Sequence, residues 1–286
     1  MKVPWWTKIG AKIVLSRLPV SYDFWRRVNL FRAGRMDEGE YARKAFDSYL
    51  AAYTSIRSLP KGFTFLELGP GDSLLSAVFA KAAGCGKCYL SDSSALATQS
   101  VELYQAASQQ LSDEGFPAPD LASAKSLEDV LAACNAVYLP NGVEDLRKIP
   151  DDSIDICGSI AVLEHVRHGS FDATAEQMFR VSKGTTQHYH VVDFQDHLDH
   201  SLNNLRFSHT IWESEFFASS GFYTNRIRPA EMRRKFEKAG FTVRSENESH
   251  WIDLPLNRAK MDPYFREMPE RELLMRGVTL RLFKAD

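Results

Sequence analysis

Apolar positions recur at helical spacing up to about residue 60 and gather in short continuous runs after it. The helical stripes predict helices over about 5–18, 22–31 and 37–58. The apolar runs predict buried strands at 63–68, 87–91, 136–139, 156–160, 185–192, 241–245 and 278–283. Between them, helical patterns cover 74–83, 98–111, 126–134, 177–182 and 228–239. Strands that alternate with helices predict a doubly wound α/β fold with a seven-stranded sheet.

Composition and charge narrow the class of protein. The 286 residues are 44% hydrophobic and 12% aromatic, which excludes a disordered chain. No apolar run approaches the roughly 20 residues that a membrane-spanning helix needs. The formal net charge of −2 argues against bulk nucleic-acid binding, which requires a basic face. Four cysteines in a chain of this length, with no signal-peptide pattern at its start, predict a reduced, cytoplasmic protein.

The first 35 residues depart from this charge balance. They carry eight Lys and Arg residues against Asp23 alone, a net charge of +7, together with the pair Trp5 and Trp6. A basic helix with tryptophans can lie on an anionic membrane surface or attract an anionic substrate. It can also pack on the main domain and leave its charges in water. We therefore expect a helical extension over 1–60, and a peripheral membrane contact through 1–35 is one of three uses left open.

The segment Gly69–Ser73, with sequence GPGDS, follows the first predicted strand and precedes a helix. Glycines allow the backbone to approach a ligand closely, and the start of a helix offers free N–H groups. A dinucleotide fingerprint would need glycine where Leu74 stands, so that type of site is excluded. Asp92 ends the second predicted strand about 20 residues after the turn, where an acidic side chain typically binds the hydroxyls of a ribose.

Three stretches share a pattern with a known family. They are the acid-x-Gly-x-Gly run from Glu67 to Gly71, the stretch 150–155 with sequence PDDSID, and the stretch 162–166 with sequence VLEHV. Together with Asp92, they resemble class I S-adenosylmethionine-dependent methyltransferases that act on small molecules. The resemblance covers about 63–192 well and continues more loosely to the end of the chain. It implies one Rossmann-like methyltransferase domain over 61–286.

The resemblance also implies S-adenosyl-L-methionine as the cofactor and gives roles to the matching positions. Gly69 and Gly71 would let the backbone approach the methionine part, Glu67 would organise the turn, and Asp92 would hold the ribose hydroxyls. The implied cofactor-binding residues are Glu67, Gly69, Pro70, Gly71, Asp72, Asp92, Ser93, Val143, Glu144, Ser159 and Ile160.

The position that binds adenine departs from the family pattern. The family usually places an Asp ahead of a short residue and an acid, whereas this sequence has Gly142 in that place. Contact with adenine is then left to the Val143 backbone, the Asn141 amide or the Glu144 side chain. The sequence does not choose among these three.

Ligands of open α/β sheets bind beyond the carboxyl ends of the strands. After the fifth predicted strand, polar residues mixed with aromatics over about 197–228 predict a lid insertion above an acceptor site. Methyl transfer to an alcohol needs a base, and His197 is the first candidate, oriented by Asp196 or Asp193. His165, just past the fourth strand, is the second candidate. The predicted substrate-binding residues are Asp193, Arg206, Tyr223, Asn225 and Arg226.

A metal site is a competing interpretation of this histidine-rich region. His188 and His190 share one face of a strand, and Asp193 and His197 follow. Two histidines and a carboxylate from this set would form a site that transition metals accept. Strand periodicity places His188 and His190 inside a sheet covered on both faces, so we expect core histidines and no metal. The pair Cys85 and Cys88 lacks the second cysteine pair that a zinc site of this kind requires.

The predicted function is S-adenosylmethionine-dependent methylation of a hydroxyl on a sugar or glycan-type acceptor. The sugar assignment depends on the composition of the lid and on a resemblance of 191–197 and 223–226 to methyltransferases of bacterial surface-polysaccharide synthesis. A lipid-linked acceptor would give the basic extension a use at the inner face of the membrane. The alternatives are N- or C-methylation of another metabolite and a non-catalytic, cofactor-binding partner subunit. The oligomeric state is left open.

Overall fold

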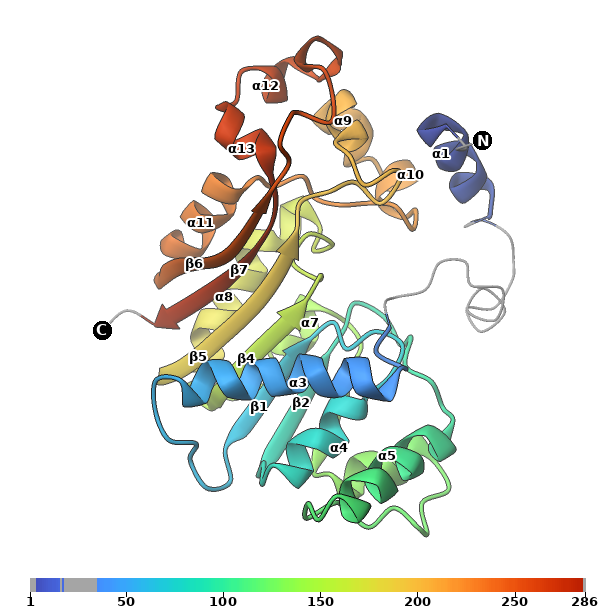
Figure 1. The fold of residues 1–286 in the computed structure, drawn as a ribbon, viewed down its shortest axis with the longest axis vertical. Coiled ribbons are helices and arrows are strands. Elements are labelled where there is room, and N and C mark those ends of the chain that lie inside the picture. Colours follow the sequence, from blue (N-terminus) through green and yellow to red (C-terminus); the bar gives the residue numbers. More distant parts are fainter. Residues whose placement is uncertain (1–3, 16, 18–34, 285–286) are drawn as a thin grey trace.

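The computed structural model describes residues 4–15, 17 and 35–284, so the helix predicted over 22–31 lies outside the described residues. Its centre is a seven-stranded sheet in the order β3-β2-β1-β4-β5-β7-β6 (Figure 1). The strands are β1 (Thr64–Leu68), β2 (Lys87–Ser91), β3 (Ala136–Leu139), β4 (Ile154–Ile160), β5 (Ser182–Asp193), β6 (Phe241–His250) and β7 (Met275–Lys284). Neighbours from β3 to β5 are parallel, whereas β7 is antiparallel to both β5 and β6. This sheet confirms the predicted α/β fold.

The order of the strands reverses at the centre of the sheet. β1 pairs with β2 on one side and with β4, which follows much later in the chain, on the other. The carboxyl ends of parallel strands meet at one edge, and a reversal of strand order there opens a crevice for ligands. The glycine turn, Asp92, His165 and His197 all follow strands that end at this edge.

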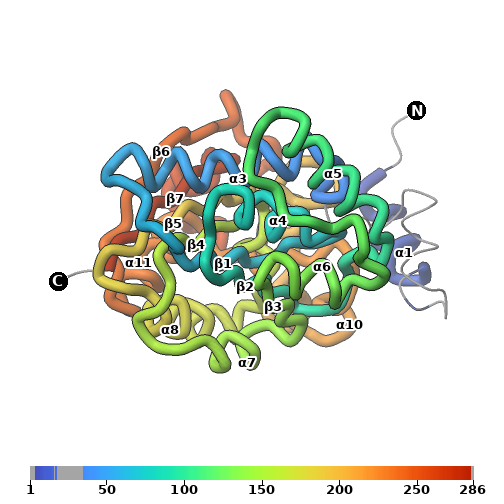
Figure 2. The backbone as a smooth tube through the Cα atoms, turned by 90° about the horizontal axis from the view of Figure 1, so that it is seen from below, coloured from blue at the N-terminus to red at the C-terminus, as the bar shows by residue number. Residues whose placement is uncertain are grey.

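Helices cover both faces of the sheet (Figure 2). The face that carries Phe65 and Ile156 packs against α3 (Gly39–Thr54), α4 (Leu75–Ala82), α5 (Val101–Asp113) and α6 (Leu127–Ala133). The face that carries Leu66 and Cys157 packs against α7 (Val143–Leu146), α8 (Phe171–Val181) and α11 (Pro229–Lys238). Successive side chains of a strand point to opposite faces, and both faces here are buried. The central strands therefore appear in the sequence as continuous apolar runs.

Helix α3 shares one core with the sheet. Its buried residues Phe46, Tyr49 and Tyr53 recur at helical spacing. Tyr49 lies directly over β4, where a Cβ at Gly158 would come within 2.5 Å of the tyrosine ring, so glycine makes the close approach possible. The boundary expected at residue 60 therefore cuts through one core, because α3 is part of the cover of the sheet and not a separate extension.

The residues between β5 and α11, about 197–228, form a compact helical segment that we call the lid. It contains η2 (Asn203–Arg206), α9 (His209–Trp212) and α10 (Glu215–Ala218). The fully buried Trp212 lies at its centre, against Phe217 and Phe222. Helix α1 (Trp5–Leu15) packs on the same cluster through Ile9, so the N-terminal helix covers the lid (Figure 1).

A second insertion, which the sequence pattern did not reveal, lies between β6 and β7. It contains η3 (Arg258–Lys260), α12 (Pro263–Arg266) and α13 (Glu270–Leu274). Its buried residues Met261, Phe265 and Leu273 pack with Leu202 and Leu205 of the lid. The elements are too short to show a helical period, and their stability comes from this shared core.

Strand β6 is longer than predicted and continues from Ser245 to His250. The added residues have the sequence ENESH and are largely exposed, because β6 is the edge strand of the sheet. A solvated edge strand needs no apolar residues, so the sequence carried no signal for its second half. None of the helices in the described ranges is long and apolar enough to cross a membrane.

Candidate active site

The glycine turn after β1 has a backbone shape that only glycine adopts without strain. Gly69 and Gly71 have φ angles of +65° and +66°. The Gly69 N–H donates a hydrogen bond to the Ser91 carbonyl, 2.7 Å away, which holds the turn against the end of β2. A Cβ at Gly69 would lie 2.3 Å from Cγ2 of Val162, in the segment after β4. The turn therefore brings bare backbone to the central edge of the sheet.

Asp92 connects the glycine turn to the end of β2. Its Oδ2 accepts a hydrogen bond from the Gly71 N–H at 3.0 Å, and its Oδ1 accepts one from the Ser93 N–H at 2.7 Å. Burial raises the pKa of Asp92, although these hydrogen bonds act in the opposite direction. Each carboxylate oxygen can accept a further hydrogen bond. The Asp92 carboxylate therefore fits the predicted role of holding two ribose hydroxyls.

Glu67 lies beneath the turn, fully buried on β1. Its Oε1 accepts a hydrogen bond from the Tyr49 hydroxyl at 3.2 Å, so the carboxyl links β1 to α3. Burial raises the pKa of Glu67 to about 7, with Asp92 adding to the effect. Pro70 and Asp72 are also buried, and the Asp72 carbonyl accepts a hydrogen bond from the Thr98 N–H at 2.9 Å.

The segment expected to contact adenine precedes and begins α7. The Asn141 side chain donates to Asp145 Oδ2 at 2.8 Å, and the exposed Glu144 pairs with Arg147 at 3.0 Å. Two of the three alternatives are thus engaged with their neighbours. This favours the Val143 backbone, which remains a prediction.

The residues at the end of β4 behave differently from one another. The Ser159 hydroxyl points into the core and forms a 2.8 Å hydrogen bond with His190 Nδ1. The side chain of Ser159 is therefore engaged in the core, and a contact of this residue with the cofactor remains a prediction. Ile160 is half-buried, and Ala161 after it has a φ of +54° and donates its N–H to the Val191 carbonyl at 2.8 Å.

The two predicted base candidates, His165 and His197, lie together. They follow β4 and β5, and their ring centroids are 4.7 Å apart in an edge-to-face arrangement. His165 Nδ1 lies 2.9 Å from the Tyr223 carbonyl, and because a carbonyl only accepts, Nδ1 carries the proton and Nε2 keeps a lone pair. Desolvation by the surrounding protein atoms, and then the neighbouring His197, lower the pKa of His165 to about 4, although the ring reaches the surface. Burial also lowers the pKa of His197, so both rings are neutral at neutral pH.

Asp196 does not orient His197 by a hydrogen bond. Its Oδ1 accepts from the Leu198 and Asp199 N–H groups at 3.0 and 2.7 Å, and its Oδ2 accepts from the Asn203 N–H at 2.5 Å. The carboxylate therefore folds the loop that follows His197, which corrects the prediction. The second proposed orienting group, Asp193, accepts hydrogen bonds from the backbone and side chain of Gln195 through Oδ1. Burial lowers the pKa of His197, and the charge of Asp193 offsets only part of this shift.

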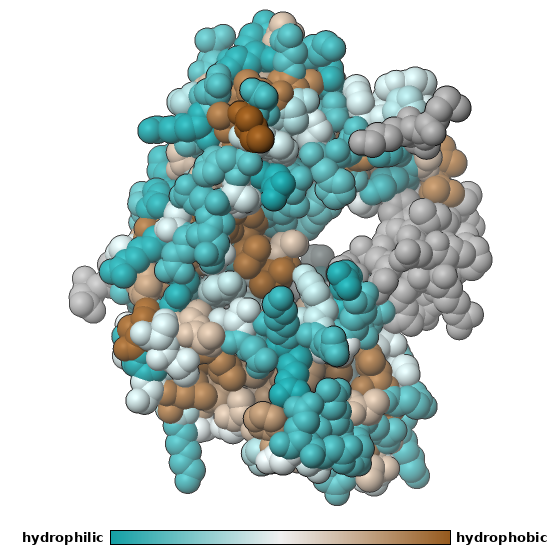
Figure 3. Space-filling view, in the orientation of Figure 1, coloured by the Kyte–Doolittle hydropathy of each residue, from teal (hydrophilic) through white to brown (hydrophobic). Residues whose placement is uncertain are grey.

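The surface is hollowed between the part of the molecule that carries β1 to β3 and the part that carries the lid (Figure 3). Lys12 of α1 reaches the rim of the acceptor side, where its Nζ lies 3.4 Å from the His197 carbonyl. Another hollow, of about 430 Å³, lies between α11, β6 and α13 and is lined in part by Arg233, Ser245 and Glu248. It contains none of the predicted site residues.

Residues 39–246 match the family described as methyltransferase domain, over more than half of the chain. The chain belongs to this family. Membership confirms an S-adenosylmethionine-dependent methyltransferase with a Rossmann-like fold and S-adenosylmethionine as its cofactor. No curated protein matches the sequence.

Two solved structures are similar to this methyltransferase. The YcgJ protein from Bacillus subtilis is 14% identical, with 84% of this chain and 99% of that chain covered and a TM-score of 0.46. CrArsM, an arsenic(III) S-adenosylmethionine methyltransferase from Chlamydomonas reinhardtii, is 18% identical, with 83% and 74% covered and a TM-score of 0.46.

Two predicted substrate-binding residues of the methyltransferase hold its own loops together. The Tyr223 hydroxyl donates to Glu213 Oε2 at 2.7 Å, inside the lid. Asn225 Nδ2 donates to the carbonyls of Leu163 and Val166 at 2.7 and 2.9 Å. These bonds pin the segment after β4 to the lid. Both polar groups have partners within the protein, and their contact with an acceptor remains a prediction.

The two predicted substrate-binding arginines are engaged in the same way. Arg226 is buried and donates from Nη1 to the Phe207 carbonyl at 2.6 Å. The guanidinium of Arg206 lies 4.9 Å from the centre of the Trp5 ring, and its Nε donates to Asn203 Oδ1 at 3.0 Å. Arg226 stabilises the lid and Arg206 joins the lid to α1, and the role of both arginines in substrate binding remains a prediction.

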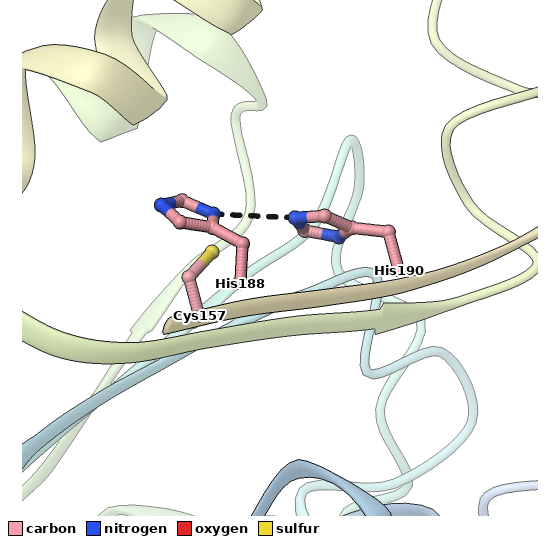
Figure 4. A group of neighbouring side chains, drawn as sticks. All are labelled: Cys157, His188 and His190. Atoms are coloured by element: carbon pink, nitrogen blue, oxygen red, sulfur yellow. Dashed lines mark hydrogen bonds between the residues drawn. The ribbon is translucent and has the colours of Figure 1, made fainter. Parts of the chain in front are cut away.

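His188 and His190 are fully buried beside Cys157, as strand periodicity predicts (Figure 4). The Ser182 hydroxyl donates to a backbone carbonyl of α8 and so accepts from His188 Nε2 at 2.8 Å. His188 Nδ1 then accepts from His190 Nε2 at 3.3 Å, and His190 Nδ1 accepts from the Ser159 hydroxyl. Every ring nitrogen has a partner. Burial lowers the pKa of His190 to about 3, so the pair is a neutral polar chain in the core.

Glu164 is a site residue whose environment the sequence did not reveal. It is fully buried next to His165, and its Oε1 accepts a hydrogen bond from the Asp193 N–H at 3.2 Å. Its Oε2 has no hydrogen-bond partner among the described residues. Burial, reinforced by the charge of Asp193, raises the pKa of Glu164 to about 8. Its place directly before a candidate base was the one available signal.

Proposed function

We propose that this methyltransferase acts on a hydroxyl oxygen of a sugar or glycan-type acceptor. The observation that carries the proposal is the contact between His165 and His197, two neutral imidazoles from different loops at the carboxyl edge of the sheet. Oxygen acceptors need a group that removes a proton, whereas an amine acceptor that reacts in its neutral form needs none. S-adenosylmethionine supplies the methyl group on a positively charged sulfur.

The residues of the glycine turn fit this cofactor. The backbone of Gly69 and Gly71 would hold its methionine part, and the Asp92 carboxylate would accept hydrogen bonds from the ribose. No side chain fits at Gly69, because a Cβ there would overlap Val162. The turn is therefore shaped to receive a ligand along bare backbone.

His197 is the proposed base. Neither of its ring nitrogens has a hydrogen-bond partner in the part of the chain that the structure describes, so one is free to receive a proton. As the acceptor oxygen bonds to the methyl carbon, the carbon–sulfur bond would break and the electron pair would stay on sulfur. His197 would take the hydroxyl proton in the same step, so no negative charge would accumulate on the acceptor. His165 is fixed by its bond to the Tyr223 carbonyl and limits the positions that the His197 ring can take. A base of this kind contributes roughly 10²- to 10⁴-fold in rate.

A lipid-linked acceptor would place the enzyme at the cytoplasmic face of a membrane, and the outer side of α1 suits such a contact. Trp6 and Val14 are each 62% exposed on one side of this helix. Arg17 lies 4.1 Å from the ring centre of Phe216, a lid residue that is 52% exposed. An apolar strip next to cations is typical of helices that bind anionic lipid surfaces.

The membrane contact is tested with vesicles of phosphatidylglycerol and of phosphatidylcholine. The full chain is expected to sediment with the anionic vesicles at low salt and to be released as the salt concentration rises. Trp6→Ala should weaken this binding, whereas Ile252→Ala, at an even more exposed apolar position outside α1, should leave it unchanged. Absence of binding to anionic vesicles at low salt would remove the contact from the proposal.

The activity is tested in two stages. Calorimetry should show S-adenosylmethionine binding, no binding of NADH, and an affinity at least about tenfold weaker in Asp92→Ala, which corresponds to roughly 1.4 kcal/mol. A screen of sugar and lipid-linked sugar acceptors should then give a methyl ether. His197→Ala should retain cofactor affinity and lose turnover. A product methylated on nitrogen or carbon, or turnover equal in His197→Ala, would overturn the O-methyltransferase proposal, and a chain that binds cofactor without turnover would be a partner subunit.

A further inference from the structure

Three side chains that could bind a metal lie close together at the carboxyl edge of the sheet, which we also call the acceptor edge. Glu164, His165 and His197 each offer a ligand atom, and these atoms all lie within 4.8 Å of one another. They come from two segments that follow adjacent strands, β4 and β5. A metal ion forms bonds of about 2 Å to its ligands, so small side-chain rotations would bring these three atoms close enough to bind one ion.

The lone pairs needed for such an ion are free. His165 donates its Nδ1 proton to the Tyr223 carbonyl, which leaves the Nε2 lone pair directed away from that contact. Histidines that bind metals commonly donate their other nitrogen to a backbone carbonyl in this way. Oε2 of Glu164 is buried without a hydrogen-bond partner among the described residues, so a cation would satisfy an atom that is otherwise left unpaired.

The backbone that carries two of the ligands is held rigidly. Asn225 holds this backbone through three hydrogen bonds. Its side chain donates to the carbonyls of Leu163 and Val166, and its N–H donates to the Glu164 carbonyl at 2.7 Å. Glu164 Oε1 is fixed in addition by the Asp193 N–H. Ligands on a fixed backbone bind an ion without losing much conformational freedom.

The buried group formed by Cys157, His188 and His190 provides an internal comparison. Its ligand atoms lie equally close together, but all four ring nitrogens already take part in the chain of hydrogen bonds between Ser182 and Ser159. An ion there would have to break that chain inside the core. In the group formed by Glu164, His165 and His197 at the acceptor edge, by contrast, Glu164 Oε2 has no hydrogen-bond partner among the described residues and the His165 side chain is exposed.

We propose that Glu164, His165 and His197 bind one divalent first-row transition-metal ion, such as Zn²⁺, and leave its remaining coordination positions open. Two imidazoles and one carboxylate suit these ions, whereas Mg²⁺ and Ca²⁺ prefer oxygen ligands. If the proposed O-methyltransferase function is correct, the open position receives the acceptor hydroxyl. A bound ion would lower the pKa of that hydroxyl, whose proton would then pass to water. His197 would serve as a ligand when the ion is bound and as the base when it is not.

The test uses the full chain, stripped of metal by a chelator, and Co²⁺ as a spectroscopic probe. Titration should produce visible absorption bands that saturate at one ion per chain, and Zn²⁺ should displace Co²⁺ whereas Mg²⁺ should not. His197→Ala should weaken Co²⁺ binding by at least about tenfold, and Glu164→Gln should do the same without changing the size of the side chain. His250→Ala, a histidine exposed on β6, is the matched control and should bind as the unmodified chain does.

Two results would overturn the metal site. One is the absence of saturable Co²⁺ binding in the folded chain. The other is a near-ultraviolet band from a thiolate bound to cobalt, which would place the ion at Cys157. The site and the proposed function fail separately. Methyl-ether formation that persists after chelation removes the ion from the reaction and keeps the enzyme, whereas Co²⁺ binding without any methyl transfer keeps the site and removes the function.

Discussion

Replacing Gly69 by Ala tests why the glycine turn needs glycine at this position. The requirement is either the left-handed backbone alone or also the close contact with Val162 after β4. Gly69 has a φ of +65°, and an added Cβ would lie 2.3 and 2.7 Å from the two methyl carbons of Val162. Gly62 is a matched control, because its φ is +68° and nothing lies within 4 Å of a Cβ there. Both substitutions share the left-handed strain, and only Gly69→Ala adds the overlap.

The left-handed conformation costs an alanine about 1 to 2 kcal/mol, which both variants should lose in free energy of unfolding. Overpacking costs about 1 to 3 kcal/mol more, so Gly69→Ala should be less stable than Gly62→Ala by that difference. The overlap also displaces the turn from Asp92, whose Oδ2 binds the Gly71 N–H. S-adenosylmethionine affinity should therefore fall at least about tenfold in Gly69→Ala and stay unchanged in Gly62→Ala.

The assay is urea unfolding of both variants, combined with calorimetric titration of the cofactor. Val162→Ala removes the methyl groups that the new Cβ would meet, so combining it with Gly69→Ala should recover about 1 kcal/mol or more beyond the sum of the separate effects. Equal losses of stability in Gly69→Ala and Gly62→Ala, together with no recovery in the double variant, would refute the contact with Val162.

Three further predictions concern buried polar groups. Asn225→Ala should lower the free energy of unfolding by about 2 to 4 kcal/mol in urea titrations, because it leaves two buried carbonyls without donors, and a loss below 1 kcal/mol would contradict this. His190 stays neutral in the folded chain, where burial lowers its pKa to about 3, whereas the unfolded chain binds a proton below about pH 6.5. The contribution of neutral His190 to stability is complete above pH 6.5 and is lost as the pH falls toward 3. Between pH 6.5 and 5, the free energy of unfolding should therefore fall by about 2 kcal/mol less in His190→Asn than in the unmodified chain. The buried carboxyl groups titrate alike in both proteins and cancel from that difference; equal losses would refute the neutral state. Tyr49→Phe should raise the pKa of Glu67 above about 7, since it removes a donor to the ionised carboxyl, and an unchanged pKa by NMR titration would show that the bond is unimportant.

The sequence was sufficient wherever structure depends on near neighbours. Strand β2 has the bounds expected from its apolar run, Lys87 to Ser91, and the glycine turn has the left-handed backbone that its two glycines indicate. Burial on both faces imposes apolar residues along a central strand, and a positive φ imposes glycine. Both signals are local, so they can be read without knowing the fold.

The sequence did not reveal the partners of the polar side chains in the lid. Tyr223, Asn225 and Arg226 have the composition of a ligand-binding segment, yet their polar atoms bind backbone and side-chain groups of the protein. Asp196 is next to His197 in the chain, but its carboxylate turns toward amides further along its own loop. Composition shows that polar groups are present, and it does not show which partners they meet.

The sequence by itself determined the α/β class, the glycine turn, Asp92 and the positions of both candidate bases. Only the tertiary structure brought His165 beside His197 and left Glu164, next to His165 in the chain, buried with an oxygen that has no hydrogen-bond partner among the described residues. Periodicity and turn chemistry arise from residues that are neighbours in the chain. A hydrogen-bond partner is decided by where distant segments pack, as in the bond from His165 to Tyr223, 58 residues away.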